Sequence, residues 1–168
     1  MLLTIRQLIY YFLYIGFIIN QLNPIIMFSK SNLLATLAAG LFNFFGGYLL
    51  WGIATVDFFS QHEGIATDVM KENPDMVFLA LGCFVQAFFM STIYSKWARG
   101  VHSAKEGFEF GALVGAFTGF GIGLLMYGVA NLSDLTGVLA EGVLEIIFTG
   151  IAGVIIALVY KSTSKKTA

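Results

Sequence analysis

Apolar residues are concentrated in four long runs, and the short segments between the runs hold most of the charged residues. The runs cover residues 33–58, 76–97, 108–132 and 138–160. A helix needs roughly 20 predominantly apolar residues to cross the hydrocarbon core of a bilayer, so each run is long enough to span it. The pattern predicts an all-α membrane protein, a four-transmembrane-helix bundle in one domain over residues 31–168.

Another apolar and aromatic stretch, residues 1–30, precedes the first run. Several polar or helix-breaking residues interrupt it: Asn20, Gln21, Asn23 and Pro24. As a fifth crossing it would put Arg6 outside, and as a cleaved signal it lacks an A-x-A-like site. Alternatively it lies along the interface, or translation begins at Met27. We favour a non-essential N-terminal extension, either interfacial or an additional helix.

Composition and charge restrict the class and the topology. Of the 168 residues 58% are hydrophobic and 11% charged, whereas about 25% of residues are charged in soluble domains. The net charge of −1 gives no basic surface for nucleic acid. The single cysteine, Cys83, excludes an intrachain disulfide.

The connections between the runs differ in the sign of their charge. The first connection is acidic, with Asp57, Glu63, Asp68, Glu72 and Asp75 against Lys71. The second is basic, with Lys96, Arg99, His102 and Lys105. Because cytoplasmic flanks accumulate Lys and Arg, we expect a multi-pass protein of the bacterial cytoplasmic (inner) membrane. The N-terminus and C-terminus of its four-helix core would both be cytoplasmic.

The first and third runs resemble each other when residues 35–54 are aligned with residues 111–130. Identical pairs are Leu37/Leu113, Phe44/Phe120, Gly47/Gly123, Leu49/Leu125, Gly52/Gly128 and Ala54/Ala130. Each repeat unit contains two crossings, so both units have the same orientation in the membrane. The alignment predicts a bundle built from two repeated helical hairpins.

Glycine recurs every fourth position in the third run, at Gly111, Gly115, Gly119 and Gly123. Four residues nearly complete a helical turn, so these glycines share one face. Small residues at this spacing let helices approach closely in lipid, which predicts glycine-zipper packing. We expect the third helix to be central and the protein to form a dimer. A nucleotide loop is excluded, because the spacing G-x-G-x-G follows no strand.

Polar residues within the runs are the candidate binding residues, since each is costly in lipid unless it is paired. They are Asn43, Gln86 and Glu145, joined by Glu141 one helical turn before Glu145 and by Asn131 at the end of the third run. One interpretation is a small polar cavity or proton-responsive site for a solute or lipid. The other is interhelical hydrogen bonding, with Glu145 protonated or paired with Asn131 or Thr149. We favour the second.

Aromatic residues near the ends of the runs match the belts that anchor helices at membrane interfaces. Trp51 and Tyr127 occupy equivalent positions at the acidic side. Tyr94, Trp97 and Tyr160 lie at the basic side. We expect all five to be belt residues.

Candidate catalytic and metal chemistry is weak. His62 and His102 fall on opposite sides of the membrane, so they cannot share a metal. Asp57, His62 and Glu63 match no specific metal motif. No nucleophile–base pair stands out, so we expect no enzymatic activity, no metal and no cofactor.

The chain from residue 108 onward resembles small four-helix bacterial membrane proteins classed as domains of unknown function. Their second halves often read FGALFGLxxYxxYDLTNLAT, and the matching residues are Phe110, Gly111, Ala112, Leu113, Gly115, Tyr127, Asn131 and Leu132. The first half, GYLLWGIATVDFF, is similar to short proteins of Bacteroidetes-type bacteria. Gly128 and Ala130 replace the usual Asp and Thr, so the role of that Asp is absent here or has moved to Glu145. The resemblance implies an architecture and no activity.

These observations leave two candidate functions. We favour a structural or accessory membrane protein, for example in envelope homeostasis, whose partners are the lipid bilayer and a second copy. The alternative is a small transporter or channel-like protein with an intramembrane polar site around Glu145.

Overall fold

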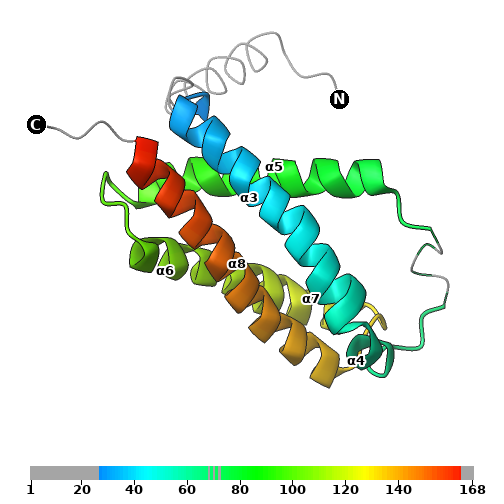
Figure 1. The fold of residues 1–168 in the computed structure, drawn as a ribbon. Coiled ribbons are helices and arrows are strands. Elements are labelled where there is room, and N and C mark those ends of the chain that lie inside the picture. Colours follow the sequence, from blue (N-terminus) through cyan, green and yellow to red (C-terminus); the bar gives the residue numbers. More distant parts are fainter. Residues whose placement is uncertain (1–26, 68, 70, 72, 164–168) are drawn as a thin grey trace, which may run out of the picture.

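The computed structural model describes residues 27–67, 69, 71 and 73–163. The predicted N-terminal extension therefore lies outside the described residues, apart from its last four positions. Among the described residues, four helices are long and apolar enough to cross a membrane, and α-helical and π-helical segments make up these spans. The predicted all-α, four-helix membrane architecture is confirmed (Figure 1).

Two of the spans contain π-helical segments. The first span is α3 (Lys30–Leu49) continued by η1 (Leu50–Ala54), and the short α4 (Val56–Ser60) follows it. The second is α5 (Met76–Trp97). The third combines α6 (Ala104–Gly115), η2 (Ala116–Ile122) and α7 (Gly123–Val129), and the fourth is α8 (Leu135–Thr163).

Side-chain caps fix where the helices begin. The oxygen of an N-cap side chain accepts from an otherwise unpaired backbone N–H of the first turn. Ser29, Asp75 and Ser103 cap α3, α5 and α6 in this way. Asp134 accepts from the N–H of Gly137 at 2.8 Å, which begins α8. These caps explain why α6 and α8 begin earlier than their apolar runs do.

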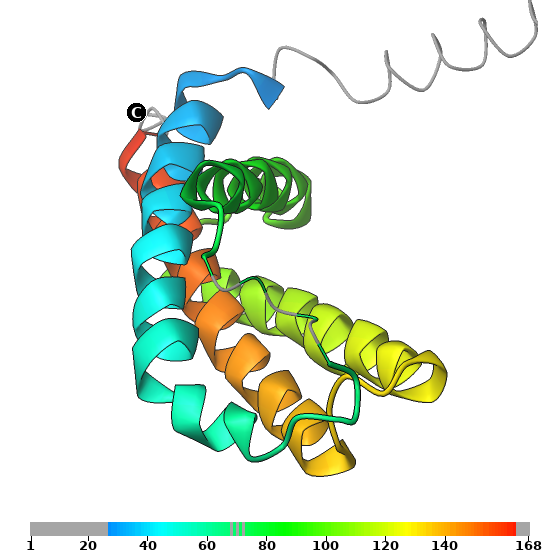
Figure 2. The same cartoon turned by 90° about the vertical axis from the view of Figure 1, so that its right-hand side faces the viewer.

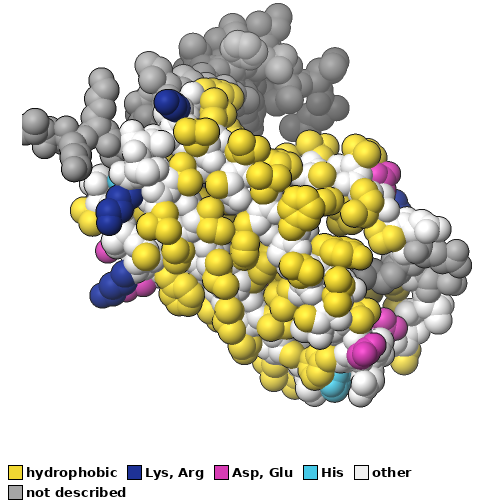
Figure 3. Space-filling model, in the orientation of Figure 1, with side chains coloured by type: hydrophobic (Ala, Val, Ile, Leu, Met, Phe, Trp, Pro, Cys, Tyr) yellow, Lys and Arg dark blue, Asp and Glu magenta, His cyan; other side chains and the backbone are white. Residues whose placement is uncertain are grey.

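The two ends of the molecule differ in charge. We call the end with residues 55–67, 73–75 and 130–134 the acidic end. The end with Lys30, residues 98–103 and Lys161 is the basic end. Figure 3 shows hydrophobic side chains over the middle of the molecule, with charged side chains towards its ends. This distribution is the one expected of a protein that crosses a bilayer.

The fourth helix, α8, is the central element. It packs against α3, α5, α6, η2 and α7, and Figure 2 shows α3 on one side of it and the third span on the other. In an apolar stretch of 18 consecutive residues of α8, 39% of the residues are buried, against 11% in such a stretch of the third span. The prediction that the third helix is central is therefore wrong: the glycine face of the third span packs against α8 and Phe110 packs against α5, but most of the rest of the span is exposed or half-buried.

The second span, α5, is only partly packed. Its buried residues all lie in its second half, towards the basic end: Ala87, Met90, Ser91, Thr92 and Tyr94. In Figures 1 and 2 α5 crosses the line of α3 instead of running along it, so its first half diverges from the other helices. Val77 and Phe78 in this half are 76% and 70% exposed.

The two hairpins pack differently. The alignment of residue 35 with residue 111 makes residues 116–122 equivalent to residues 40–46. The former are π-helical and the latter belong to α3. A π-helical turn joins residue i to i+5, so it changes the directions of the residues that follow relative to those of a continuous α-helix. The α6–α8 pair is therefore no copy of the α3–α5 pair.

Candidate functional site

Asn32 holds three helices together at the basic end. Its side chain is fully buried, and its amide donates to the Thr92 hydroxyl of α5 at 3.1 Å. The Tyr160 hydroxyl of α8 donates to its Oδ1 at 3.1 Å, and the same amide donates to the Met27 carbonyl. Both ends of the Asn32 amide are thus paired, as buried polar groups require.

Aromatic rings surround this cluster. Tyr94 packs edge-on against Tyr160 and Phe110, with ring centroids 5.6 and 5.5 Å apart. His102 lies at 3.3 Å from the Tyr94 hydroxyl through Nδ1 and also contacts the Tyr160 ring. Burial lowers the pKa of His102. Tyr94 is 0% exposed and Tyr160 6%, so their prediction as belt residues is wrong, whereas Trp97 is 45% exposed.

The glycines of the third span bring its backbone against α8. A Cβ atom on Gly111 would clash with the Thr149 carbonyl and Gly150, and one on Gly115 would clash with the Glu145 carbonyl. The Thr149 hydroxyl donates across this contact to the Gly111 carbonyl at 2.9 Å. Gly119 faces Gly142 and the Glu145 Cβ. The close contact between α6 and α8 therefore depends on the absence of a side chain at these glycines.

The fourth glycine of the series, Gly123, is different. A Cβ atom there would meet only Val138, at the ordinary distance of 3.4 Å. Gly123 instead lines a cavity of about 220 Å³ at the acidic end, between α4, α7 and α8. The close contact with α8 thus ends within η2, and space opens beyond it.

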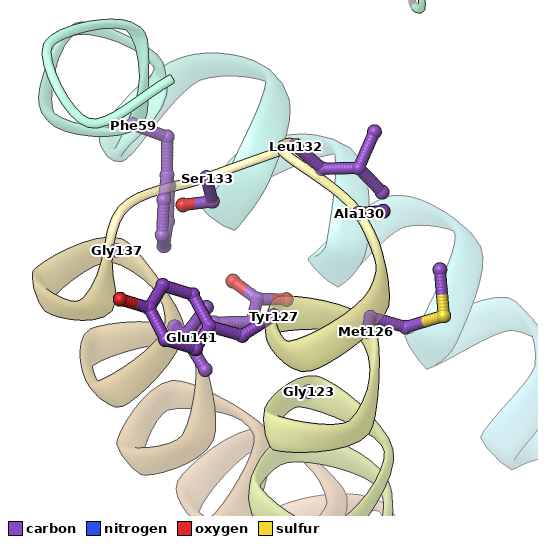
Figure 4. A pocket seen from close by; sticks show the side chains of 10 residues that line it. Phe59, Gly123, Met126, Tyr127, Ala130, Leu132, Ser133, Gly137 and Glu141 are labelled. Carbon is purple, nitrogen blue, oxygen red and sulfur yellow. The ribbon is translucent and has the colours of Figure 1, made fainter. Parts of the chain in front are cut away.

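Glu141 lies in this cavity. Its Oε2 accepts from the Trp51 indole N–H at 2.8 Å. Figure 4 shows the carboxylate between α7 and α8, with the Phe59 ring pointing into the cavity from α4. Other lining residues are Met126, Tyr127, Leu132, Ser133 and Val138. The arrangement is one carboxylate, held by an indole, among apolar and aromatic groups.

Glu145 lies one helical turn further into the span. Its Oε2 is buried and has no hydrogen-bond partner among the described residues. Neither partner suggested by the sequence takes this role. The Thr149 hydroxyl donates to the Gly111 and Glu145 backbone carbonyls, and the Asn131 carbonyl accepts from the Ala66 N–H in the loops of the acidic end.

The predicted binding residues therefore do not form one site. Asn43 donates to the Gln86 side chain at 3.2 Å where α3 and α5 meet, and the Asn43 Oδ1 is buried without a partner among the described residues. Glu141 and Glu145 form a second pair on α8. Asn131 is exposed and lies in the connection before α8.

The connections of the acidic end bind to each other. The Gly64 N–H donates to the Leu132 carbonyl at 3.0 Å, and the Asp134 N–H donates to the His62 carbonyl at 2.9 Å. His62 Nδ1 lies 2.8 Å from the Asp134 carboxylate. The hydrogen bonds from the Gly137 N–H and from His62 hold the pKa of Asp134 below its usual value. These contacts tie the first hairpin to the second.

Three of these contacts were missed by the sequence interpretation: the Asn32 cluster, the Trp51–Glu141 bond and the His62–Asp134 pair. Each joins residues at least 60 positions apart. The signal for the first was the presence of Asn32, Ser91 and Thr92 at the ends of apolar runs.

Comparison with known proteins yields no match, whether to protein-family models, to curated proteins or to solved structures. The resemblance to four-helix proteins of unknown function stays a prediction.

Proposed function

We propose that this protein is a small transporter or channel-like membrane protein whose working groups are the Glu141 and Glu145 carboxylates. The observation that carries the proposal is the Glu145 carboxylate, which is partly buried within a membrane span and has one oxygen without a partner in the described part of the chain. Ionisable groups within a membrane are costly, and those that are kept mark pathways and proton relays by default.

The position of Glu141 supports the same function. It lies one turn closer to the acidic end and lines a cavity there. Like charges four residues apart on a helix repel each other, so taking up a proton or cation at one carboxylate favours ionisation of the other. The two carboxylates thus provide a short relay from the cavity towards the middle of α8.

Topology belongs to the same proposal. The positive-inside rule places the basic end in the cytoplasm and the acidic end outside a bacterial inner membrane. The cavity then opens on the outer side, where Asp57, Glu63, Asp75 and Asp134 increase the local concentration of cations. We further propose that the protein forms a dimer and catalyses no reaction.

The test is a flux measurement in proteoliposomes with a pH-sensitive dye inside. The wild type should dissipate an imposed pH gradient faster than protein-free vesicles. Glu145→Gln should lower this rate by about tenfold or more, because an amide cannot carry the proton. The matched control is Glu109→Gln, an exposed carboxylate of α6 outside the cavity, which should keep the wild-type rate. A folded Glu145→Gln protein with an unchanged flux would refute the proposal.

A structural or accessory role is the second candidate. It is favoured by the close glycine contact of α6 with α8 and by the satisfied Asn32 cluster, which serve assembly alone. In this case Glu145→Leu should be tolerated and no flux should be seen in any variant.

A further inference from the structure

We propose that the acidic-end cavity binds a compact organic cation of the quaternary ammonium type, with Glu141 as its counter-ion. This inference rests on the proposed function and names the class of solute for the same site. It starts from the lining of the cavity, in which Glu141 is the one carboxylate that the described residues contribute, among apolar, aromatic and small groups.

The carboxylate is positioned for a ligand. The Trp51 indole donates to one oxygen at 2.8 Å and so fixes the side chain from the α3 side. A carboxylate has about four acceptor positions, of which this bond uses one. In Figure 4 the carboxylate lies between α7 and α8, where the cavity is. The remaining positions are available to a cation there.

The lining favours an organic cation over a metal ion. Ca²⁺ takes roughly six to eight oxygen ligands, and Mg²⁺ requires near-octahedral oxygen geometry. The side-chain oxygens of the lining residues are those of Glu141, Ser133 and Tyr127, too few for such a metal, and the Ser133 hydroxyl already donates to the His62 carbonyl at 3.0 Å. No group of three or more His, Cys, Asp or Glu residues able to hold a metal exists among the described residues.

The aromatic side chains of the lining suit an ammonium ion that carries alkyl groups. Such cations bind to the faces of aromatic rings and bury their alkyl groups against apolar side chains. Phe59 contributes a ring from α4 and Tyr127 one from α7, and Met126 adds a polarisable side chain. The cavity of about 220 Å³ is smaller than the roughly 300–1,000 Å³ typical of pockets for drug-sized ligands, so the cation must be compact.

Access from the acidic end is open. Ala130, Leu132 and Ser133, which belong to the connection before α8, line the cavity, and Leu132 is 41% exposed, so the cavity reaches the surface beyond the end of α7. Exposed carboxylates at the same end attract cations before they enter.

Tryptophan fluorescence tests the proposal directly, because the chain has two tryptophans. In a Trp97→Phe background, Trp51 alone reports on the Glu141 carboxylate. Titrating the full chain in detergent with tetraethylammonium chloride should give a saturable change, and sodium chloride at equal ionic strength should not. Adding Glu141→Gln should weaken the apparent affinity about tenfold or more, whereas Glu109→Gln, at an exposed position of α6, should leave it within about twofold.

A second variant separates loss of the site from loss of folding. Ala130→Leu fills the cavity without changing charge, and Gly128→Ala is its control, since a Cβ there meets no atom within 4 Å. Binding should be lost in the first and kept in the second.

The proposal is overturned if tetraethylammonium gives no saturable change, if sodium gives the same change, or if folded Glu141→Gln and Ala130→Leu proteins bind like the wild type. If binding fails while Glu145→Gln still abolishes the pH-driven flux, the proposed transport function stands and only the solute class is wrong. If binding succeeds without any flux, the cation site stands and transport does not.

Discussion

Buried polar side chains differ in their hydrogen bonding between the two ends of this molecule. At the basic end Asn32 is fully buried with both ends of its amide paired, and aromatic rings close around the cluster. Towards the acidic end Glu141 lines a cavity, and Glu145, one turn deeper in the span, has a buried oxygen with no partner among the described residues. A satisfied polar cluster stabilises one fold, whereas an unsatisfied carboxylate in a membrane costs stability and points to function.

The largest expected loss of stability comes from disrupting the contact between α6 and α8. Gly111→Leu places a side chain against the Thr149 carbonyl and Gly150, so it should destabilise the fold by about 3 kcal/mol or more. Unfolding in detergent, followed by circular dichroism, measures this.

The control for that measurement is Gly82→Leu in α5. A Cβ atom at Gly82 meets no atom within 4 Å, so this substitution should change the stability by about 0.5 kcal/mol or less. Equal losses in the two variants would show that the glycine contact does not hold the helices together.

The next largest effect compares two buried asparagines. Asn32→Ala leaves the Tyr160 hydroxyl without this acceptor and should cost about 2 kcal/mol. Asn43→Ala removes one interhelical hydrogen bond to Gln86 and should cost about 0.5 kcal/mol. The same unfolding assay ranks them. A larger loss for Asn43 would place the stabilising polar cluster in the middle of the membrane instead of at the basic end.

The smallest effect is a pH dependence at the basic end. Burial holds the pKa of His102 below its usual value of about 6.5. The unfolded chain therefore binds the proton first, and stability is lost as the pH falls below about 6.5. His102→Gln should remove this part of the decline in thermal midpoint between pH 7.5 and 5. An identical decline in both proteins would exclude His102 as its source.

The acidic end should respond in a lower pH window. The pKa of Asp134 is held below its usual value of about 3.9, so its contribution is present above that pH and is lost as the pH falls further. The His102→Gln comparison at pH 5 and above is thus free of the Asp134 titration.

The spans could be predicted from sequence because length and apolarity define them, and caps such as Asp75 mark their starts. The identity of the central helix could not. All four runs are apolar on every side, so no amphipathic stripe shows which face is buried. The spacing of Gly111, Gly115 and Gly119 can be read from the sequence. That these glycines pack against α8 cannot.

The site was predicted less completely. Glu141 and Glu145 could be singled out because a carboxylate in an apolar run is costly. Their partners could not, since the Trp51–Glu141 bond joins residues 90 positions apart. Tyr160 near the end of its run is typical of an interface residue, and only the packing of α8 against α3 and α5 buries it.

The central claim is that polar groups hold the basic end together and are functional at the acidic end. Its most direct test is the thermal unfolding midpoint, in one detergent, of two variants that each change a single polar group. Tyr160→Phe, which removes the donor to Asn32, should lower the midpoint. Glu145→Gln should leave it unchanged or raise it, because the buried oxygen has no partner to lose among the described residues. A midpoint for Glu145→Gln as low as that of Tyr160→Phe would contradict the claim.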